Sequence, residues 1–269
     1  MRLFLLASSR LDEFWTSVLD SLVAEPKVEI VGACIDARKP VPIGRRLRRE
    51  IDKGRGAYVA VMAVKLLARA LNDRSTATHP YLRERGVPAR DTNDLYGPET
   101  LEFIRGTAPD CIFRFGFGLI REPVLSLAPK GVISYHHGNI RRYRGQPVAF
   151  WELLNGESEM AVTVQVLTEQ LDAGRIVVER PVPIGRTDTW RALERRAYDT
   201  SRSMVREACV LLDRPGHVPE LVPENELGAL YTTPNFREWA TLQRRVLARR
   251  IRTRRETSRA TTEPSSRRR

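Results

Sequence analysis

Apolar residues along the chain gather in short runs, and stretches of helical periodicity separate these runs. Residues 2–7 and 28–34 are apolar runs with the length and composition of buried strands. Between them, residues 11–24 carry apolar side chains at helical spacing, among them Phe14 and Val18. A strand, a helix and a second strand in this order predict the opening of a doubly wound α/β sheet.

The same alternation continues as far as residue 212. Further strands are expected at residues 110–115, 131–135, 161–167 and 175–181. Further helices are expected at residues 57–71, 81–86, 97–107, 147–155 and 189–212. The run at 161–167 is almost continuously apolar or β-branched, which is typical of a strand buried on both faces. We therefore expect residues 1–212 to form one doubly wound, mostly parallel twisted sheet with helices on both faces.

The pattern weakens after residue 212. We expect residues 213–242 to be a short C-terminal extension and residues 243–269 to be an arginine-rich, disordered tail, because apolar side chains are nearly absent beyond residue 253. Residues 236–251, at the junction of these two parts, have the spacing of a basic amphipathic helix.

Much of the net charge of +12 belongs to the tail, where eleven arginines stand against two glutamates. A solvated appendage is the favoured interpretation. The second is weak contact with an anionic membrane, through a helix whose apolar side is Trp239, Leu242, Val246, Leu247 and Ile251. Binding of nucleic acid through phosphate charge alone is the least favoured, because no nucleic-acid-binding motif accompanies the arginines.

Composition and spacing exclude several classes of protein. No apolar run has the length of a membrane span, and the apolar start at residues 2–7 is too short for a secretory signal. The turn at residues 7–10 lacks the glycine-rich fingerprint of dinucleotide-binding proteins. Cys34, Cys111 and Cys209 form neither a metal-ligand spacing nor a disulfide framework, so we expect a cytoplasmic protein without a metal.

Two polar segments next to predicted strands carry candidate catalytic side chains. His136 follows the strand predicted at residues 131–135, and Asp172 lies in the turn between the strands predicted at 161–167 and 175–181. An imidazole and a carboxylate that meet at such strand ends can orient and transfer protons in acyl-transfer chemistry.

The segments around these two residues resemble the folate-dependent formyltransferase family, which includes glycinamide ribonucleotide, methionyl-tRNA and sugar N-formyltransferases. The likeness rests on Arg142-Tyr143-Arg144-Gly145 and Leu171-Asp172-Ala173-Gly174, and it is strongest over residues 110–179. It implies that His136 and Asp172 are the catalytic pair and that 10-formyltetrahydrofolate is the formyl donor. It further implies a small-molecule amine as acceptor, for example an amino sugar. A methionyl-tRNA acceptor is less favoured, because the family's tRNA-binding barrel needs more residues than the tail offers.

The resemblance also indicates binding residues. It implies that backbone groups of one loop bind the pterin ring of the donor, and the residues of this loop are Phe117, Gly118, Leu119 and Ile120. Arg142 and Arg144 are candidates for binding a phosphate or carboxylate of the acceptor, because guanidinium groups suit such anions. A basic turn that only holds its own loop is the equally weighted alternative.

One position departs from the family pattern. The family has an asparagine two residues before the histidine, and this chain has Ser134 there. The asparagine amide is a donor to the oxyanion of the tetrahedral intermediate, and a serine hydroxyl is shorter. Either catalysis persists with Ser134 as a weaker donor, with Asn139 as a candidate replacement amide, or the acceptor and reaction have changed.

Two further functions stay open for this reason. A formyltetrahydrofolate deformylase is one, because His136-His137 matches the adjacent histidines of the related deformylases. A non-catalytic folate- or metabolite-binding homologue is the other. A homodimer is compatible with all of these functions.

Overall fold

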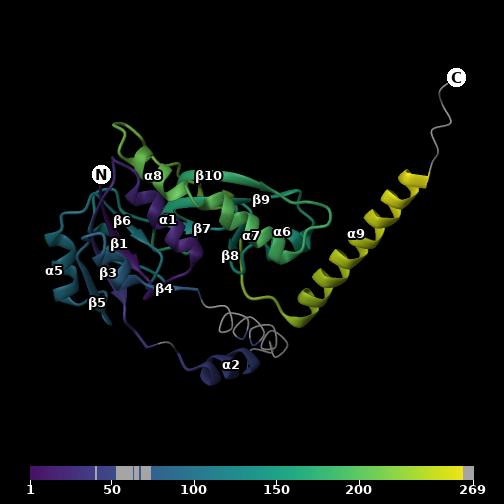
Figure 1. Ribbon diagram of the computed structural model, residues 1–269, viewed down its shortest axis with the longest axis horizontal. Helices are drawn as coiled ribbons and strands as arrows, with labels where there is room; N and C mark the ends of the chain where they lie inside the picture. Colours follow the sequence, from purple (N-terminus) through teal and green to yellow (C-terminus); the bar gives the residue numbers. More distant parts are fainter. Residues whose placement is uncertain (40, 53–62, 64–66, 68–73, 263–269) are drawn as a thin grey trace.

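The computed structural model describes residues 1–39, 41–52, 63, 67 and 74–262. Its centre is a seven-stranded sheet with the strand order β10-β9-β7-β6-β1-β3-β5 (Figure 1). The strands are β1 (Arg2–Ala7), β3 (Glu29–Asp36), β5 (Ala89–Thr92), β6 (Cys111–Arg114), β7 (Val132–His136), β9 (Glu159–Val166) and β10 (Arg175–Pro183). Five adjacent strands of the sheet run parallel, in the order β5-β3-β1-β6-β7, whereas β9 is antiparallel to both β7 and β10. The expected mostly parallel α/β sheet is confirmed.

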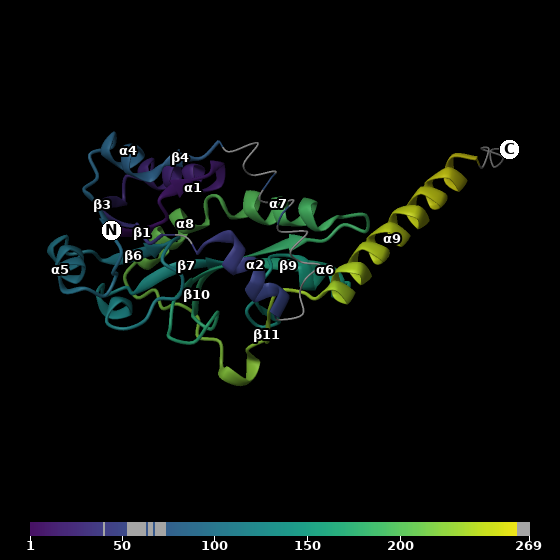
Figure 2. The same ribbon diagram turned by 90° about the horizontal axis from the view of Figure 1, so that it is seen from below.

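Helices cover both faces of this sheet (Figure 2). The described helices of the body are α1 (Glu13–Val23), α2 (Ile43–Asp52), α4 (Thr78–Arg83), α5 (Pro98–Gly106), α6 (Phe150–Asn155), α7 (Trp190–Ser201) and α8 (Met204–Leu212). Helices α1, α6, α7 and α8 bury their apolar sides in one core cluster, and α5 with the 3₁₀ helix η1 (Val124–Ser126) buries its own in a second. The helix expected at residues 57–71 lies outside the described residues, apart from 63 and 67.

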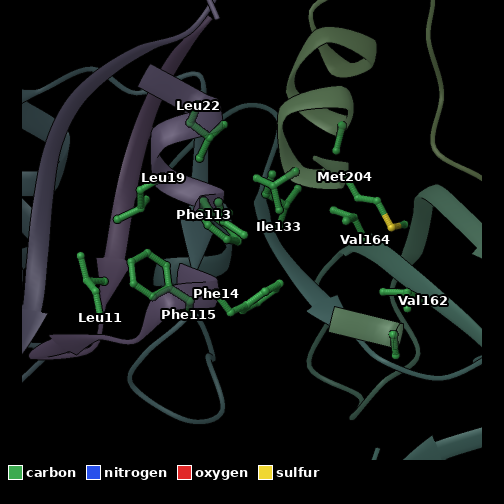
Figure 3. Close-up of a cluster of buried hydrophobic side chains, with 14 of the residues drawn as sticks. Leu11, Phe14, Leu19, Leu22, Phe113, Phe115, Ile133, Val162, Val164 and Met204 are labelled. Carbon is green, nitrogen blue, oxygen red and sulfur yellow. The ribbon is translucent and has the colours of Figure 1, made fainter. Parts of the chain in front are cut away.

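Helix α1 shows how the sequence builds the larger core. Asp12 caps its first turn by accepting a hydrogen bond from the Trp15 N–H at 3.0 Å. Its buried side carries Phe14 and Leu19, which lie over the sheet beside Phe113 (Figure 3). Burial of one such side chain contributes about 1.5–3 kcal/mol, so this amphipathic stripe holds the helix on the sheet.

The single helix expected at residues 189–212 is wrong, because α7 and α8 are separate helices. The chain turns at Arg202 and Ser203, and the Ser203 hydroxyl donates to the Glu207 carboxylate at 2.9 Å. A serine that bonds within its own first turn favours a helix start. The apolar spacing on either side continues through this two-residue turn, so periodicity alone does not register the break.

The extension after α8 returns to the body of the protein. It contains the 3₁₀ helix η2 (Glu224–Glu226) and strand β11 (Ala229–Tyr231), which pairs in parallel with β8 (Tyr143–Gly145). A separate two-stranded pairing joins β2 (Arg10–Leu11) to β4 (Thr76–Ala77).

Helix α9 (Phe236–Thr262) projects away from the body (Figures 1 and 2). The disorder expected from residue 243 is therefore wrong as far as Thr262. Its first turns are anchored by Trp239, which stacks on Phe150 with 5.5 Å between ring centroids, and by the buried Leu242. The residues that follow include no glycine or proline before Pro264, so a helix begun by these contacts can propagate.

The same docking changes the apolar side expected for membrane contact. Leu242 and Val246 are buried in the larger core cluster, and Trp239 packs against it. Of the five residues of that side, Leu247 and Ile251 stay exposed. Among the described residues, no helix is both long enough and apolar enough to cross a membrane.

Candidate active site

The structure brings His136 and Asp172 together. His136 is the last residue of β7, and the loop between β9 and β10 returns to it, so that His136 Nδ1 lies 3.4 Å from Asp172 Oδ1. The side chains are 6% and 19% exposed, so the pair is shielded but the carboxylate stays within reach of a ligand. The predicted proximity of the two residues is confirmed by this distance.

Each ring nitrogen of His136 faces an oxygen. Nε2 lies 2.9 Å from the Tyr143 carbonyl oxygen and donates to it, while Nδ1 faces Asp172. Burial alone lowers the pKa of His136, but the bond and charge of Asp172 outweigh it and raise the pKa above its usual value. An imidazolium paired with a carboxylate is the state that this geometry favours.

Asp172 is kept as a carboxylate facing His136 by its neighbours and by its own backbone conformation. Burial raises the pKa of its carboxyl group, but His136, the Gly145 N–H and the charge of Arg114 together bring that pKa below its usual value. Oδ2 accepts from the Gly145 N–H at 2.9 Å, and the residue itself has a left-handed φ of 48°. Aspartate tolerates this conformation better than most side chains.

The glycine that follows is required by close packing. A Cβ on Gly174 would collide with the Val166 carbonyl oxygen and would lie 2.7 Å from Gln165 Oε1. The Gly174 N–H also donates to Gln165 Oε1 at 2.8 Å. The Leu-Asp-x-Gly segment therefore places the carboxylate because its last residue can approach β9 closely.

Ser134 is almost fully buried on β7 and is tied to the neighbouring strand. Its hydroxyl donates to the Arg114 carbonyl oxygen at 3.1 Å and accepts from Arg114 Nη1 at 3.3 Å. The Arg114 side chain also donates to the carbonyl oxygens of Gly116, at 3.0 Å, and Gly118. Ser134 thus lies in the predicted site, with a cation beside it.

These residues line a cleft of about 560 Å³. Its polar wall includes Arg114, Ser134, His136, Gln165 and Asp172, and its apolar wall includes Leu119, Ile120 and Leu167. Among the described residues, no cluster of three or more histidine, cysteine or acidic side chains is arranged to hold a metal ion.

The loop that follows β6 contributes to the cleft only in part. Gly118, Leu119 and Ile120 line it, and pterin binding by their backbone groups stays a prediction. Phe117 does not line it: its side chain is buried in the second core cluster, with the Arg38 guanidinium 5.4 Å from its ring centroid. Phe117 has a left-handed φ of 65°, which turns its side chain from the cleft to the core.

Arg142 and Arg144 bind other parts of the protein and do not line the cleft. Arg142 forms an ion pair with Glu157 at 2.9 Å. Arg144 donates to the carbonyl oxygens of Gly228, at 2.7 Å, and Leu171, at 3.4 Å. These contacts favour the second of the two interpretations, a basic turn that holds its own loop, and acceptor binding by these arginines stays a prediction.

His137 also lines the cleft, but its ring contacts other groups than the ring of His136 does. It stacks on Tyr135 with 5.2 Å between ring centroids, and its Nε2 lies 3.1 Å from Ser201 Oγ. Burial lowers its pKa to about 3, so the ring is neutral near pH 7. Asn139, the candidate replacement amide, uses its side-chain oxygen to accept from the Arg141 N–H at 2.9 Å and is absent from the cleft lining.

Three polar residues of this region, Arg114, Gln165 and Glu152, were not predicted from the sequence. Arg114 and Gln165 interrupt or end runs that are otherwise apolar, Cys111–Arg114 and Glu159–Val166, and that interruption is the signal available in the sequence. Glu152 lies on α6, where burial raises the pKa of its carboxyl group to about 7. Nothing in the local pattern distinguishes it from an exposed helix residue.

Comparison with known proteins gives three kinds of likeness. The family described as "Formyl transferase" matches residues 46–209. A methionyl-tRNA formyltransferase from Citrifermentans bemidjiense is 32% identical over 179 residues, which are 66% of this chain and 51% of that protein. The chain therefore spans about half the length of this curated relative.

Solved structures with the same fold are more distant in sequence. A glycinamide ribonucleotide transformylase from Symbiobacterium toebii has a TM-score of 0.54 at 16% identity, over 83% of this chain and 94% of that chain. A sugar N-formyltransferase from Shewanella sp FDAARGOS_354 has a TM-score of 0.57 at 14% identity, over 91% and 87%. An N-formyltransferase from Helicobacter canadensis, solved with folinic acid and dTDP-3-aminofucose, has a TM-score of 0.56 at 12% identity, over 91% and 81%.

Proposed function

The chain belongs to the formyltransferase family, and from this premise we propose that it transfers a formyl group from 10-formyltetrahydrofolate to the amine of a small metabolite. The observation that carries the proposal is the buried His136–Asp172 ion pair, with 3.4 Å between Nδ1 and Oδ1, in the wall of an open cleft. A pair buried for structure alone has no need of a cleft around it.

The formyl donor is consumed in this reaction, so it is a second substrate. The cleft suits such a molecule because it combines an apolar wall, at Leu119, Ile120 and Leu167, with the polar groups of β7 and β9. The backbone of residues 118–120 is the candidate contact for the pterin ring, as the family resemblance implies.

The reaction moves electrons and protons in two steps. The amine lone pair forms a bond to the formyl carbon, and the carbonyl π electrons move to oxygen to give an oxyanion. The carbonyl then re-forms, the bond from carbon to the folate nitrogen breaks, and that nitrogen takes up a proton. In this scheme Asp172 accepts the proton that the amine loses, directly or through water, and the positive His136 favours negative charge in the cleft.

We propose an amino sugar as the acceptor. Support comes from the sugar N-formyltransferase from Shewanella and from the Helicobacter enzyme solved with dTDP-3-aminofucose, each of which shares this fold over 91% of the chain. The Helicobacter enzyme and the glycinamide ribonucleotide transformylase therefore give the acceptors to try first, namely dTDP-amino sugars and glycinamide ribonucleotide.

The test is release of tetrahydrofolate from 10-formyltetrahydrofolate with a panel of amines that includes dTDP-amino sugars and glycinamide ribonucleotide. We expect amine-dependent release, and we expect His136→Ala to slow it roughly a hundredfold or more. Absence of release with every amine, together with an unchanged background in His136→Ala, would contradict the proposal.

One observation favours a hydrolase as the second candidate. His137, adjacent to His136 as in the related deformylases, also lines the cleft. A deformylase would use water where the transferase uses an amine. Release of formate and tetrahydrofolate at the full rate without any amine would identify that activity.

A further inference from the structure

Three polar side chains form a row across three neighbouring strands. Ser134 on β7 and Gln165 on β9 are register partners in an antiparallel pair, so their side chains lie on the same face of the sheet. On the other side, Arg114 on β6 contacts Ser134 through Nη1 at 3.3 Å. All three line the cleft. The row is centred on the position at which the family has its asparagine.

Gln165 has a buried donor with nothing to bind. The side chain is 1% exposed, and its Oε1 accepts from the Gly174 N–H at 2.8 Å. This bond fixes which end of the amide is oxygen, because an N–H must face an acceptor. Nε2 is then left without a hydrogen-bond partner among the described residues. A buried amide without a partner is costly, so a donor left free in a cleft wall points to a ligand acceptor.

Arg114 has donors to spare as well. A guanidinium group carries five N–H donors, and this one uses three of them, on the Gly116 and Gly118 carbonyl oxygens and on Ser134 Oγ. Within the described part of the chain, no carboxylate lies within ion-pair distance of it. The charge therefore faces the cleft uncompensated by direct contact, although the field of Asp172 acts on it.

His136 is not free to supply the missing donor in this conformation. Its Nε2–H is given to the Tyr143 carbonyl oxygen, and its Nδ1 faces Asp172. The Ser134 hydroxyl has a single hydrogen, which is donated to the Arg114 carbonyl oxygen at 3.1 Å. Of the polar side chains in the row, those of Gln165 and Arg114 keep N–H groups available.

We propose that Gln165 Nε2 and the Arg114 guanidinium donate to the formyl oxygen and replace the amide that the family places at residue 134. The inference rests on the proposed formyl transfer. When the amine nitrogen bonds to the formyl carbon, the carbonyl π pair moves to oxygen, and these donors hold the negative charge without giving up a proton. When the carbonyl re-forms, the bond to the folate nitrogen breaks and the donors are released unchanged.

The decisive variant is Gln165→Met, which keeps the length of the side chain and removes the amide. We expect kcat to fall about a hundredfold, the size of the loss of one oxyanion donor. The dissociation constant for 5-formyltetrahydrofolate, whose formyl group is on a different nitrogen, should change less than about threefold. Gln243→Met, on the exposed side of α9, is the matched control and should keep the wild-type kcat.

Rescue separates a donor role from a structural one. Adding Ser134→Asn to Gln165→Met restores an amide at the family position, and we expect it to recover at least about tenfold in kcat. Arg114→Lys keeps the charge but loses the planar fork, and we expect it to lower kcat by about tenfold.

Each failure has its own signature. A wild-type protein that releases no tetrahydrofolate with any amine contradicts the proposed function itself. An active wild type with Gln165→Met within threefold of its kcat overturns only this inference, and so does a loss in Gln165→Met that is accompanied by lost 5-formyltetrahydrofolate binding and no rescue. In the latter case Gln165 only supports the loop through Gly174.

Discussion

His136 and His137 are neighbours in sequence and lie in opposite chemical surroundings. His136 lies between Asp172 and the Tyr143 carbonyl oxygen, and its pKa is raised. His137 packs among Phe14, Tyr135 and Tyr198, and burial lowers its pKa to about 3. Desolvation lowers the pKa of both rings, so it is common to the two. The bond and charge of Asp172, with smaller contributions from the Tyr143 carbonyl and Glu152, raise the pKa of His136. For His137, burial and the charge of His136 both act to lower the pKa.

The largest expected effect comes from removal of the Asp172 carboxylate. Asp172→Asn removes the largest influence that raises the pKa of His136 and leaves burial opposed by the Tyr143 carbonyl and Glu152, so this pKa should fall toward values at which the ring is neutral. We expect kcat for formyl transfer to fall by about 10²–10⁴. Histidine NMR titration and steady-state kinetics measure the two effects. Asp188→Asn, which breaks an ion pair with Arg196 at 2.6 Å away from the cleft lining, is the control that should keep kcat.

The second prediction concerns stability in mild acid. His137 has a folded pKa far below its usual value of 6.5, so the unfolded chain binds a proton there more readily than the folded one. Its contribution is fully present above pH 6.5 and is lost as the pH falls toward 3. From pH 6.5 to 4.5 that loss amounts to about 2 kcal/mol. His137→Phe keeps the ring stacking and should be spared this loss.

The other titrating groups do not obscure this comparison. His136 has a raised folded pKa, so its contribution is fully present below pH 6.5 and is lost as the pH rises through that pKa. Asp172 has a lowered pKa, so its contribution is lost only below its usual value of 3.8. Glu152, with its pKa raised to about 7, adds stability to the folded state as the pH falls from 7 to 4.5, but it is present in both the wild type and His137→Phe. The difference between wild type and His137→Phe in urea midpoint at pH 7 and 4.5 therefore isolates His137, and equal acid sensitivity would contradict the assignment.

The smallest expected effect concerns the bond that sets the tautomer of His137. The Ser201 hydroxyl donates to the Tyr198 carbonyl oxygen at 2.9 Å, so it can only accept from His137 Nε2–H. Ser201→Ala should cost about 1 kcal/mol in urea unfolding and leave the acid-sensitive window in place. A shift of that window by more than one pH unit would contradict burial as the main cause of the low pKa of His137.

What the sequence predicts well is local. The strand that ends at His136 and the turn that carries Asp172 follow from apolar runs and turn chemistry, and the family motif adds the pairing of the two side chains. The side-chain environments of Phe117 and His137 cannot be predicted from local sequence. Each depends on which side of the backbone faces the core, in an irregular loop for Phe117 and just after a strand end for His137. Neither could be assigned without the neighbouring elements.

Two features that were not predicted, the position of Gln165 and the length of α9, share a different cause. Gln165 lies opposite Ser134 because β9 pairs antiparallel with β7, and the register between two strands cannot be predicted from the sequence of either strand alone. Helix α9 extends into the segment expected to be disordered because its first turns are anchored: Trp239 stacks on Phe150 of α6, and Leu242 is buried in the core. In both cases tertiary contact overrides what composition indicates.

The pairing of β11 with β8 has a consequence for how the protein matures. Tyr231, Thr232 and Thr233 form one wall of the cleft, and Ala229 is hydrogen-bonded into a ladder opposite Tyr143, 86 positions earlier. All seven strands of the central sheet precede β11 in the chain, so this wall of the cleft is the last of its parts in the order of synthesis. The full set of lining residues therefore requires residues 229–233 to return to β8, a segment that comes long before them in the chain.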